Sequence, residues 1–262
     1  MQFTRGSRTA AGRSARRREQ VADGRLTDAP ASMLTIRLVN STGRLTHSIE
    51  PMPAPRQRPR RATSRERLLA AAATEFAARG FAGASIDRIA RTARVNKAMI
   101  YYHFASKAAL YREILRDMFE AVASRVAETA RSGMAPADKI RAFVEAIAVE
   151  AEARSHFPPI WFREVADGGR RLDARTTGHM TSIIQTLGAI IAEGVATKRF
   201  QPVNPLLVHA AIVGPLLLYF ASDGVRRRLM HRGVAGAVRL DRPAVVAHVQ
   251  RVALGTLEGQ VS

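Results

Sequence analysis

The chain has 262 residues, no cysteine and a formal net charge of +19, with 41 lysines and arginines against 22 acidic residues. This length allows one or two domains with a sizeable core, and the lack of cysteine excludes a disulfide framework and a thiolate metal site. The charge favours a polyanionic partner, either nucleic acid or an anionic membrane surface, although a solvated basic surface gives the same balance.

Residues 1–61 form a basic tail, with 13 arginines and 4 acidic residues, a "PMPAP" run and little helical or strand periodicity. Low apolar content with like charges predicts a disordered extension. Two interpretations stay open. The tail adds non-specific attraction to phosphates, or part of it precedes a true start near Met52.

No apolar segment with a small-residue cleavage site follows the first arginines, so no secretory signal is expected. The most apolar stretch, 206–221, has 16 residues and contains Gly214 and Pro215. It is shorter than the roughly 20 residues that cross a bilayer. We therefore expect a buried helix in a cytoplasmic protein without membrane contact.

A helical pattern begins at residue 62 with "TSRERLLAAAATEFAARG". Thr63 or Ser64 is the expected N-cap and Gly80 the expected stop. The apolar positions fall on one helical stripe, comprising Leu68, Leu69, Ala72, Ala73 and Phe76.

Two short helices and a long one follow. Ser85 is placed to cap the first, "IDRIARTA", and Asn96 the second, "AMIYYHF", after a break of about three residues. Ser106 then caps "KAALYREILRDMFEAVASRVAETA". A medium helix, two short helices around a tight turn and a long helix indicate a helix-turn-helix within a helical bundle.

The remaining pattern is helical, with Gly and Pro at the breaks. Helices are expected at about 137–154, 157–167, 173–198, 205–222 and 242–258. No useful strand pattern appears after residue 62, so the predicted fold is all-α.

Residues 64–115, "SRERLLAAAATEFAARGFAGASIDRIARTARVNKAMIYYHFASKAALYREIL", resemble the DNA-binding domain of TetR-type transcriptional regulators. The resemblance implies an N-terminal three-helix DNA-binding domain at 62–107 and a larger helical domain at 108–262. The second domain would bind a small effector and form a homodimer. The implied protein is a regulator and not an enzyme, most often a repressor, and needs no cofactor.

In this motif the second short helix enters the major groove, where each base pair shows its own donor and acceptor pattern. Base-edge contacts are expected from the start of this helix and phosphate contacts from the following turn and the next helix. The predicted DNA-binding residues are Ser85, Arg94, Asn96, Lys97, Ala98, Met99, Tyr101, Tyr102, His103 and Lys107.

Some of these assignments carry alternatives. Tyr102 either contacts phosphate or packs inward with only its hydroxyl exposed. Arg94 stands where the family commonly has Gly, and Met99 where it often has a small hydroxyl residue. The operator preference of relatives is therefore not transferable. Ile100 and Phe104 are assigned to the core of the domain.

Aromatic and aliphatic side chains of the second domain are candidates for an effector pocket that suits a hydrophobic or amphipathic molecule. Arg163 and Glu164, together with His179, are the expected polar contacts. The predicted pocket residues are Phe119, Phe143, Ile147, Phe157, Trp161, Phe162, His179, Met180 and Ile184.

Helices 205–222 and 242–258 are too apolar to be left in water, so we expect them to form a four-helix dimer interface. The expected mechanism is a ligand-driven shift of the long helix beginning at Ser106. This shift changes the distance between the two recognition helices, so that they no longer match successive grooves of a pseudo-palindromic operator.

Two other classes of protein are alternatives. A helical metal-dependent enzyme would need His156, His179 and a carboxylate to meet, but no HExxH run, nucleophile elbow or phosphate-binding Gly loop appears. A basic architectural nucleic-acid-binding protein would depend on the tail at 1–61 and bind without ligand sensing.

Overall fold

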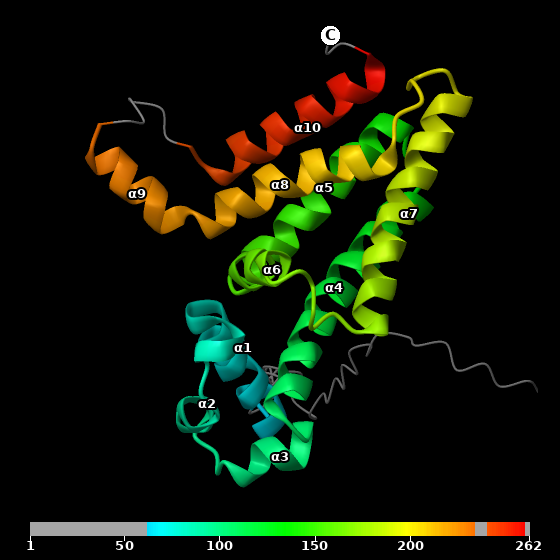
Figure 1. Cartoon of the computed structure of the whole chain (residues 1–262). Coiled ribbons are helices and arrows are strands. Elements are labelled where there is room, and N and C mark those ends of the chain that lie inside the picture. The colour runs from blue at the N-terminus through cyan, green and yellow to red at the C-terminus, as the bar shows by residue number, and fades with distance from the viewer. Residues whose placement is uncertain (1–61, 234–239, 260–262) are drawn as a thin grey trace, which may run out of the picture. The chain divides into compact units, whose positions relative to one another are not determined.

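The computed structural model describes residues 62–233 and 240–259, so the predictions for the tail at 1–61 lie outside the described residues. Within these ranges the chain forms helices and no strand, which confirms the all-α prediction. The helices are α1 (Ser64–Gly83), α2 (Ile86–Ala93), α3 (Ala98–Phe104), α4 (Lys107–Arg131), α5 (Pro136–Ala153), α6 (Phe157–Ala166), α7 (Ala174–Ala196), α8 (Pro205–Ala221), α9 (Asp223–His231) and α10 (Arg242–Glu258), as Figure 1 shows.

The first helix begins with a capping box. The Thr63 side chain accepts the backbone N–H of Glu66 at 3.2 Å, while the Glu66 carboxylate accepts the backbone N–H of Thr63 at 2.7 Å. Each bond satisfies an amide that the helix itself leaves unpaired. At the other end Gly80 has φ 68° and ψ 177°, so the regular helix kinks there before a last turn at 81–83.

The long helix α4 joins two packed groups of helices. At about 1.5 Å per residue its 25 residues span on the order of 37 Å. Its first turns pack on α1 and α3, and its later turns on α5 and α7. The predicted domain boundary at 107–108 therefore falls at the start of one continuous helix, whose N-cap is Ser106 as expected.

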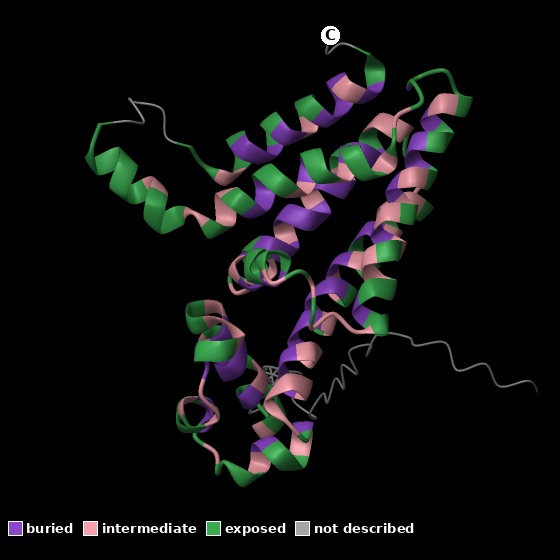
Figure 2. Ribbon diagram, viewed as in Figure 1, coloured by how far each residue is buried: buried purple, intermediate pink, exposed green. Residues whose placement is uncertain are grey.

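The larger group packs α4, α5, α7, α8 and α10 around a core of aliphatic and phenylalanine side chains, and Figure 2 shows buried residues along each of these helices. The ring of Phe200 packs closely against Gly194 near the end of α7. A Cβ at Gly194 would lie 2.0 Å from Cδ2 of Phe200, so only glycine lets this ring reach the core.

The structure also contains a helix that is not expected from the sequence pattern. α9 has no buried residue, and its segment, "DGVRRRLMH", lacks the apolar stripe by which a packed helix is recognised. Among the described residues, no single helix is long and apolar enough to cross a membrane, whereas the pair α8 and α9, bent by 66°, meets the length and composition criteria when taken together.

Candidate nucleic-acid interface and apolar cavity

The start of α2 is held against α1 by one carboxylate. Glu75 Oε1 accepts the backbone N–H of Ser85 at 3.1 Å and Nε of Arg88 at 2.6 Å. Burial acts to raise the pKa of Glu75, but these hydrogen bonds and the charges of Arg88 and Arg79 outweigh it, so the pKa lies below its ordinary value. Ser85 occupies the predicted N-cap position without a side-chain cap bond.

The turn between α2 and α3 depends on a left-handed residue. Arg94 has φ 55° and ψ 49°, and its backbone N–H donates to the carbonyl of Arg91 at 3.1 Å. A non-glycine residue in this region costs on the order of 1 kcal/mol. The exposed side chain of Arg94 lies at the turn that presents α3.

The first residues of α3 and the residues just before it form an exposed face. Oδ1 of Asn96 accepts the backbone N–H of Ala98 at 2.9 Å, but the N-cap position of α3 is Lys97, which makes no side-chain cap bond, so the predicted cap at Asn96 lies one residue too early. Lys97 and Ala98 are exposed, and Tyr101 lies one turn after Lys97 and is 51% exposed. Met99 is partly buried against the core, so its side chain is less available than the others.

The structure places Tyr102 outward, with 80% of its surface exposed. Ile100 and Phe104 are buried, as expected for the residues that anchor this helix. His103 is half-buried, with Nε2 3.2 Å from Oγ of Ser64 at the start of α1. The alternation of inward and outward residues thus follows the two faces of one helix.

Lys107 lies away from this face and contacts the end of α1. Its ammonium donates to the carbonyl oxygen of Ala82 at 3.3 Å and lies 4.8 Å from the centre of the Phe81 ring. Burial, with the charges of Arg171 and Arg88, lowers the pKa of Lys107. A phosphate contact by Lys107 would therefore compete with its contact to α1.

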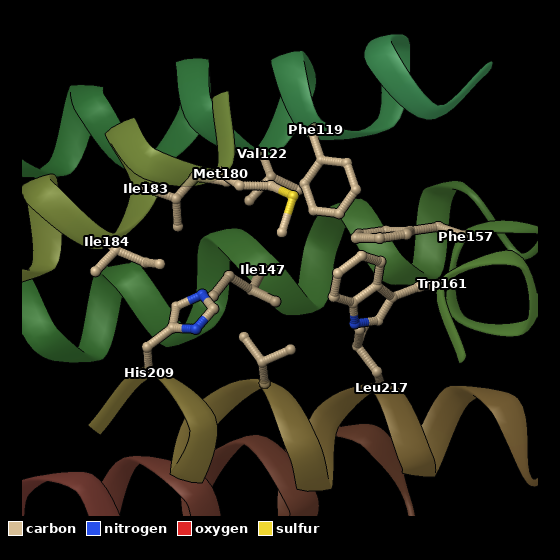
Figure 3. A pocket seen from close by; sticks show the side chains of 11 residues that line it. Phe119, Val122, Ile147, Phe157, Trp161, Met180, Ile183, Ile184, His209 and Leu217 are labelled. Atoms are coloured by element: carbon tan, nitrogen blue, oxygen red, sulfur yellow. The ribbon is translucent and has the colours of Figure 1, made fainter. Parts of the chain in front are cut away.

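An apolar cavity of about 50 Å³ lies within the larger group of helices. Its walls come from α4, α5, α6, α7 and α8, and Figure 3 shows the side chains around it. The lining residues are Phe119, Val122, Ile147, Phe157, Trp161, Met180, Ile183, Ile184, His209, Val213 and Leu217.

Aromatic rings form one end of this cavity. The Phe119 ring packs edge-on against Phe157 at 5.6 Å and against Trp161 at 5.1 Å between ring centres. The imidazole of His209 projects from α8 toward the cavity, and burial lowers its pKa, which favours the neutral ring. The lining carries no acidic side chain, lysine or arginine, so it suits an uncharged ligand.

Six of the nine predicted pocket residues line the cavity. Phe143 is instead fully buried in the core, Phe162 is 38% exposed on α6, and His179 is half-buried outside the lining. His209, Val213 and Leu217, which the sequence analysis did not select, are the contribution of α8. From the sequence, α8 is expected only in the dimer interface. In the structure its residues at 208, 212, 216 and 217 are buried, so α8 also has a face that points into the protein.

Helix α6 touches both the cavity and α1. While Phe157 and Trp161 line the cavity, the Arg163 guanidinium donates to the carbonyl oxygens of Ala77 and Ala78, the latter at 3.2 Å. Arg163 was an expected ligand contact, but it binds the carbonyls just before the kink of α1.

Glu164 is also used within the protein. It is fully buried and accepts the hydroxyl of Tyr111 at 3.0 Å and the backbone N–H of Arg171 at 2.8 Å. Burial, followed by the nearby Glu164 charge, raises the pKa of Tyr111. The Arg171 guanidinium, which also pairs with Glu164, lies 4.5 Å from the centre of the Phe81 ring in α1. Through Arg163 and Glu164, α6 is thus joined to α1 and α4.

Exposed apolar side chains lie on both α8 and α10. Leu206, Leu207 and Leu218 are 55%, 67% and 59% exposed, and Val252 on the adjacent α10 is 39% exposed. α8 and α10 pack against each other, and these exposed residues lie on the two helices predicted to dimerise.

The described residues contain no group of three or more histidine, aspartate or glutamate side chains placed to hold a metal ion. His156 and His179 therefore do not meet a carboxylate in such a group. Burial, with the charge of Arg154, lowers the pKa of His156.

Comparison with protein-family models identifies residues 68–114 with the family described as bacterial regulatory proteins, tetR family. The HTH-type transcriptional regulator RutR from Escherichia coli O157:H7 is 30% identical over 141 residues, which are 53% of this chain and 65% of that protein. The match thus spans less than two thirds of this relative. The HTH-type transcriptional activator FasR from Mycolicibacterium smegmatis is 38% identical over 82 residues, 31% of this chain and 37% of FasR.

Among solved structures, the fatty acid degradation regulator FadR from Bacillus halodurans superposes with a TM-score of 0.58 and 16% identity, covering 75% of this chain and 97% of FadR. At this identity the likeness concerns the fold alone.

Proposed function

Because the chain belongs to the TetR family of bacterial transcriptional regulators, we propose that it binds a pseudo-palindromic operator as a homodimer and leaves it when a small apolar effector enters the cavity. The mode we propose is repression, and the proposed location is the cytoplasm. The exposed face at the start of α3, within a helix-turn-helix that matches the family, is the observation that carries this proposal.

Support for operator binding comes from the side chains on that face. Lys97 and Tyr101 are separated by four residues, so they share one side of α3. An ammonium can donate to O6 or N7 of guanine, and a tyrosine hydroxyl can donate to a phosphate oxygen. Residues 62–107 contain eight lysines and arginines against three acidic residues, which adds attraction for the DNA backbone.

The test of this step is selection of bound duplexes from a random pool, followed by titration of the selected sequence and a scrambled control at fixed salt. A regulator should prefer its site by about 1,000-fold or more. The architectural alternative wins if Lys97→Ala and Tyr101→Phe leave site preference intact while deletion of residues 1–61 abolishes DNA binding.

The exposed apolar residues of α8 and α10 support the dimer. Three exposed leucines on one helix are unfavourable in water, and a two-fold contact between copies would bury them. Such a dimer presents two copies of α3, whose half-sites should be spaced by about 34 Å, one turn of B-DNA.

The size of the cavity supports a coupling between ligand and DNA. Pockets for drug-sized ligands measure about 300–1,000 Å³, whereas this cavity measures about 50 Å³. A drug-sized ligand must therefore move the walls of the cavity apart. Two walls, α4 and α6, also hold α1, so their displacement would reorient the helix-turn-helix. The ligand's differential affinity for the two arrangements would release the operator.

An effector screen tests this second step. Uncharged aromatic and aliphatic compounds are scored for a rise in Tm and for loss of operator binding. Val213→Phe fills the cavity from α8 and should cancel both responses, whereas Val165→Phe on the exposed side of α6 should retain them. Release of DNA from the Val213→Phe protein at the same ligand concentration would contradict the proposed site.

A further inference from the structure

The two helices of the helix-turn-helix are joined across their exposed side by one ion pair. Nζ of Lys97 lies 2.9 Å from Oδ1 of Asp87, which belongs to the first turn of α2. The two side chains are 49% and 62% exposed, so both are accessible to a molecule that docks on this face. The lysine that the DNA proposal relies on therefore already has an anionic partner.

Asp87 differs in its surroundings from the other two acidic residues between 62 and 107. Glu66 belongs to the capping box of α1, and Glu75 holds α1 to α2 through Ser85 and Arg88. Both stabilise the fold of the domain. Asp87 instead contacts a residue of the proposed reading face, and its hydrogen bond to Lys97 raises the pKa of that ammonium.

The chemistry of the ammonium allows Lys97 to keep this partner while it binds DNA. An ammonium has three N–H donors, and one hydrogen bond to Asp87 leaves two for a base edge such as O6 and N7 of guanine. The pair also restricts a long, flexible side chain, which lowers the conformational entropy that Lys97 would lose when it binds a base.

A phosphate interacts differently with this pair. An exposed ion pair is worth about 0–1 kcal/mol, so a phosphate can draw Lys97 away from Asp87. The aspartate then faces the DNA backbone without a partner and repels it. Capture of Lys97 by random DNA is thus offset by the exposed carboxylate, whereas a base contact made with the pair intact is not.

We propose that Asp87 is a specificity-determining residue, which directs Lys97 to base edges of the operator and weakens its capture by the phosphates of random DNA. This inference rests on the proposed function. It concerns the ratio of operator binding to non-specific binding rather than the existence of binding.

The experiment compares the full-length chain with its Asp87→Asn variant by fluorescence anisotropy, on the selected operator and on a scrambled duplex of equal length, at several salt concentrations. The variant should bind scrambled DNA roughly three- to tenfold more tightly, with a salt slope steeper by about one. Its operator affinity should stay the same or fall, so that the preference for the operator drops at least about threefold.

Two further variants separate positioning from charge. Asp87→Glu keeps a carboxylate and should recover most of the preference. In a Lys97→Met background, Asp87→Asn should change the affinities for operator and scrambled DNA by one common factor, because the directed ammonium is gone. The matched control is Asp138→Asn on α5, which also removes an exposed aspartate from an ion pair, with Arg141 at 2.6 Å. It should leave both affinities unchanged.

The inference is overturned if Asp87→Asn strengthens both affinities equally in the wild-type background, since Asp87 would then act only as a general negative charge. A wild-type chain that does not distinguish the operator from scrambled DNA would instead overturn the proposed function, and the inference with it. Thermal unfolding of each variant checks that the helix-turn-helix remains folded.

Discussion

The exposed face of α3 and the cavity between α4 and α8 solve opposite physical problems. The first keeps Lys97, Tyr101 and Tyr102 in water, with Ile100 and Phe104 buried behind them. The second surrounds a small space with mostly apolar side chains, whose exposure to water would be unfavourable. Substitutions on the α3 face should therefore cost little stability, whereas substitutions in the cavity should affect both ligand binding and stability.

The largest effect is expected in the cavity wall. Leu217 on α8 is 1% exposed, so Leu217→Ala should lower the free energy of unfolding by about 2–5 kcal/mol. The matched change on the other region is Tyr102→Ala at 80% exposure, which should alter stability by no more than about 0.5 kcal/mol. Urea unfolding of both variants measures the difference, and equal losses would refute the contrast.

The next effect concerns the outer side of the same helix. Leu207→Glu combined with Leu218→Glu places charges at two exposed apolar positions of α8 and should produce monomers in sedimentation experiments. Operator affinity should fall by about 100-fold or more, because one half-site replaces two. Met134→Glu, at an exposed apolar residue between α4 and α5, is the control and should remain dimeric.

A smaller effect is expected on the α3 face. Lys97→Ala removes a proposed base contact and should weaken operator binding by about 10- to 100-fold, with loss of preference at one base position. Tyr101→Phe removes one proposed hydroxyl contact to phosphate and should weaken DNA binding by about 1 kcal/mol of free energy, by the same amount for every DNA sequence. Binding titrations on operator variants distinguish the two. A uniform loss for Lys97→Ala would show that it contacts only the backbone.

The smallest effect is a pH dependence in the region that holds the cavity. Asp173 caps α7 through the backbone N–H of Thr176 at 2.9 Å and pairs with Arg116 at 2.9 Å. Burial acts to raise its pKa, but these contacts outweigh it and lower the pKa from 3.8 to about 2.

The folded state therefore binds the Asp173 proton less readily than the unfolded chain. The stability from this carboxylate is present above about pH 4 and is lost as the pH falls toward 2. Asp173→Asn should flatten the curve of unfolding free energy against pH over this interval. Parallel curves for variant and wild type would contradict the assigned contacts.

Local signals predicted much of the first region. Thr63 and Ser106 cap the helices expected of them, because a capping bond is made within four residues of chain. The ends of α5, α6, α7, α8 and α10 lie within two residues of the expected ones, since Gly and Pro mark them directly. Arg94, which stands where the family commonly has Gly, adopts the left-handed backbone that glycine favours.

The cavity was only partly predictable. Side chains from five helices surround it, and their order along the chain does not state which face of each helix points inward. Phe162 and Trp161 are neighbours with similar chemistry, yet one is partly exposed and the other lines the cavity. Arg163 and Glu164 looked like ligand contacts, but their partners lie in α1 and α4, about fifty to ninety residues away in sequence.

The sequence by itself determined the all-α class, the helix-turn-helix and the face that α3 turns outward, because capping, helical periodicity and turn chemistry act between near neighbours. Only the tertiary structure decided that Tyr102 points to water, that His209 joins the cavity, that α6 bridges the cavity and α1, and that Lys97 meets Asp87. These outcomes depend on how separate helices pack, and packing is set by all of their surfaces at once.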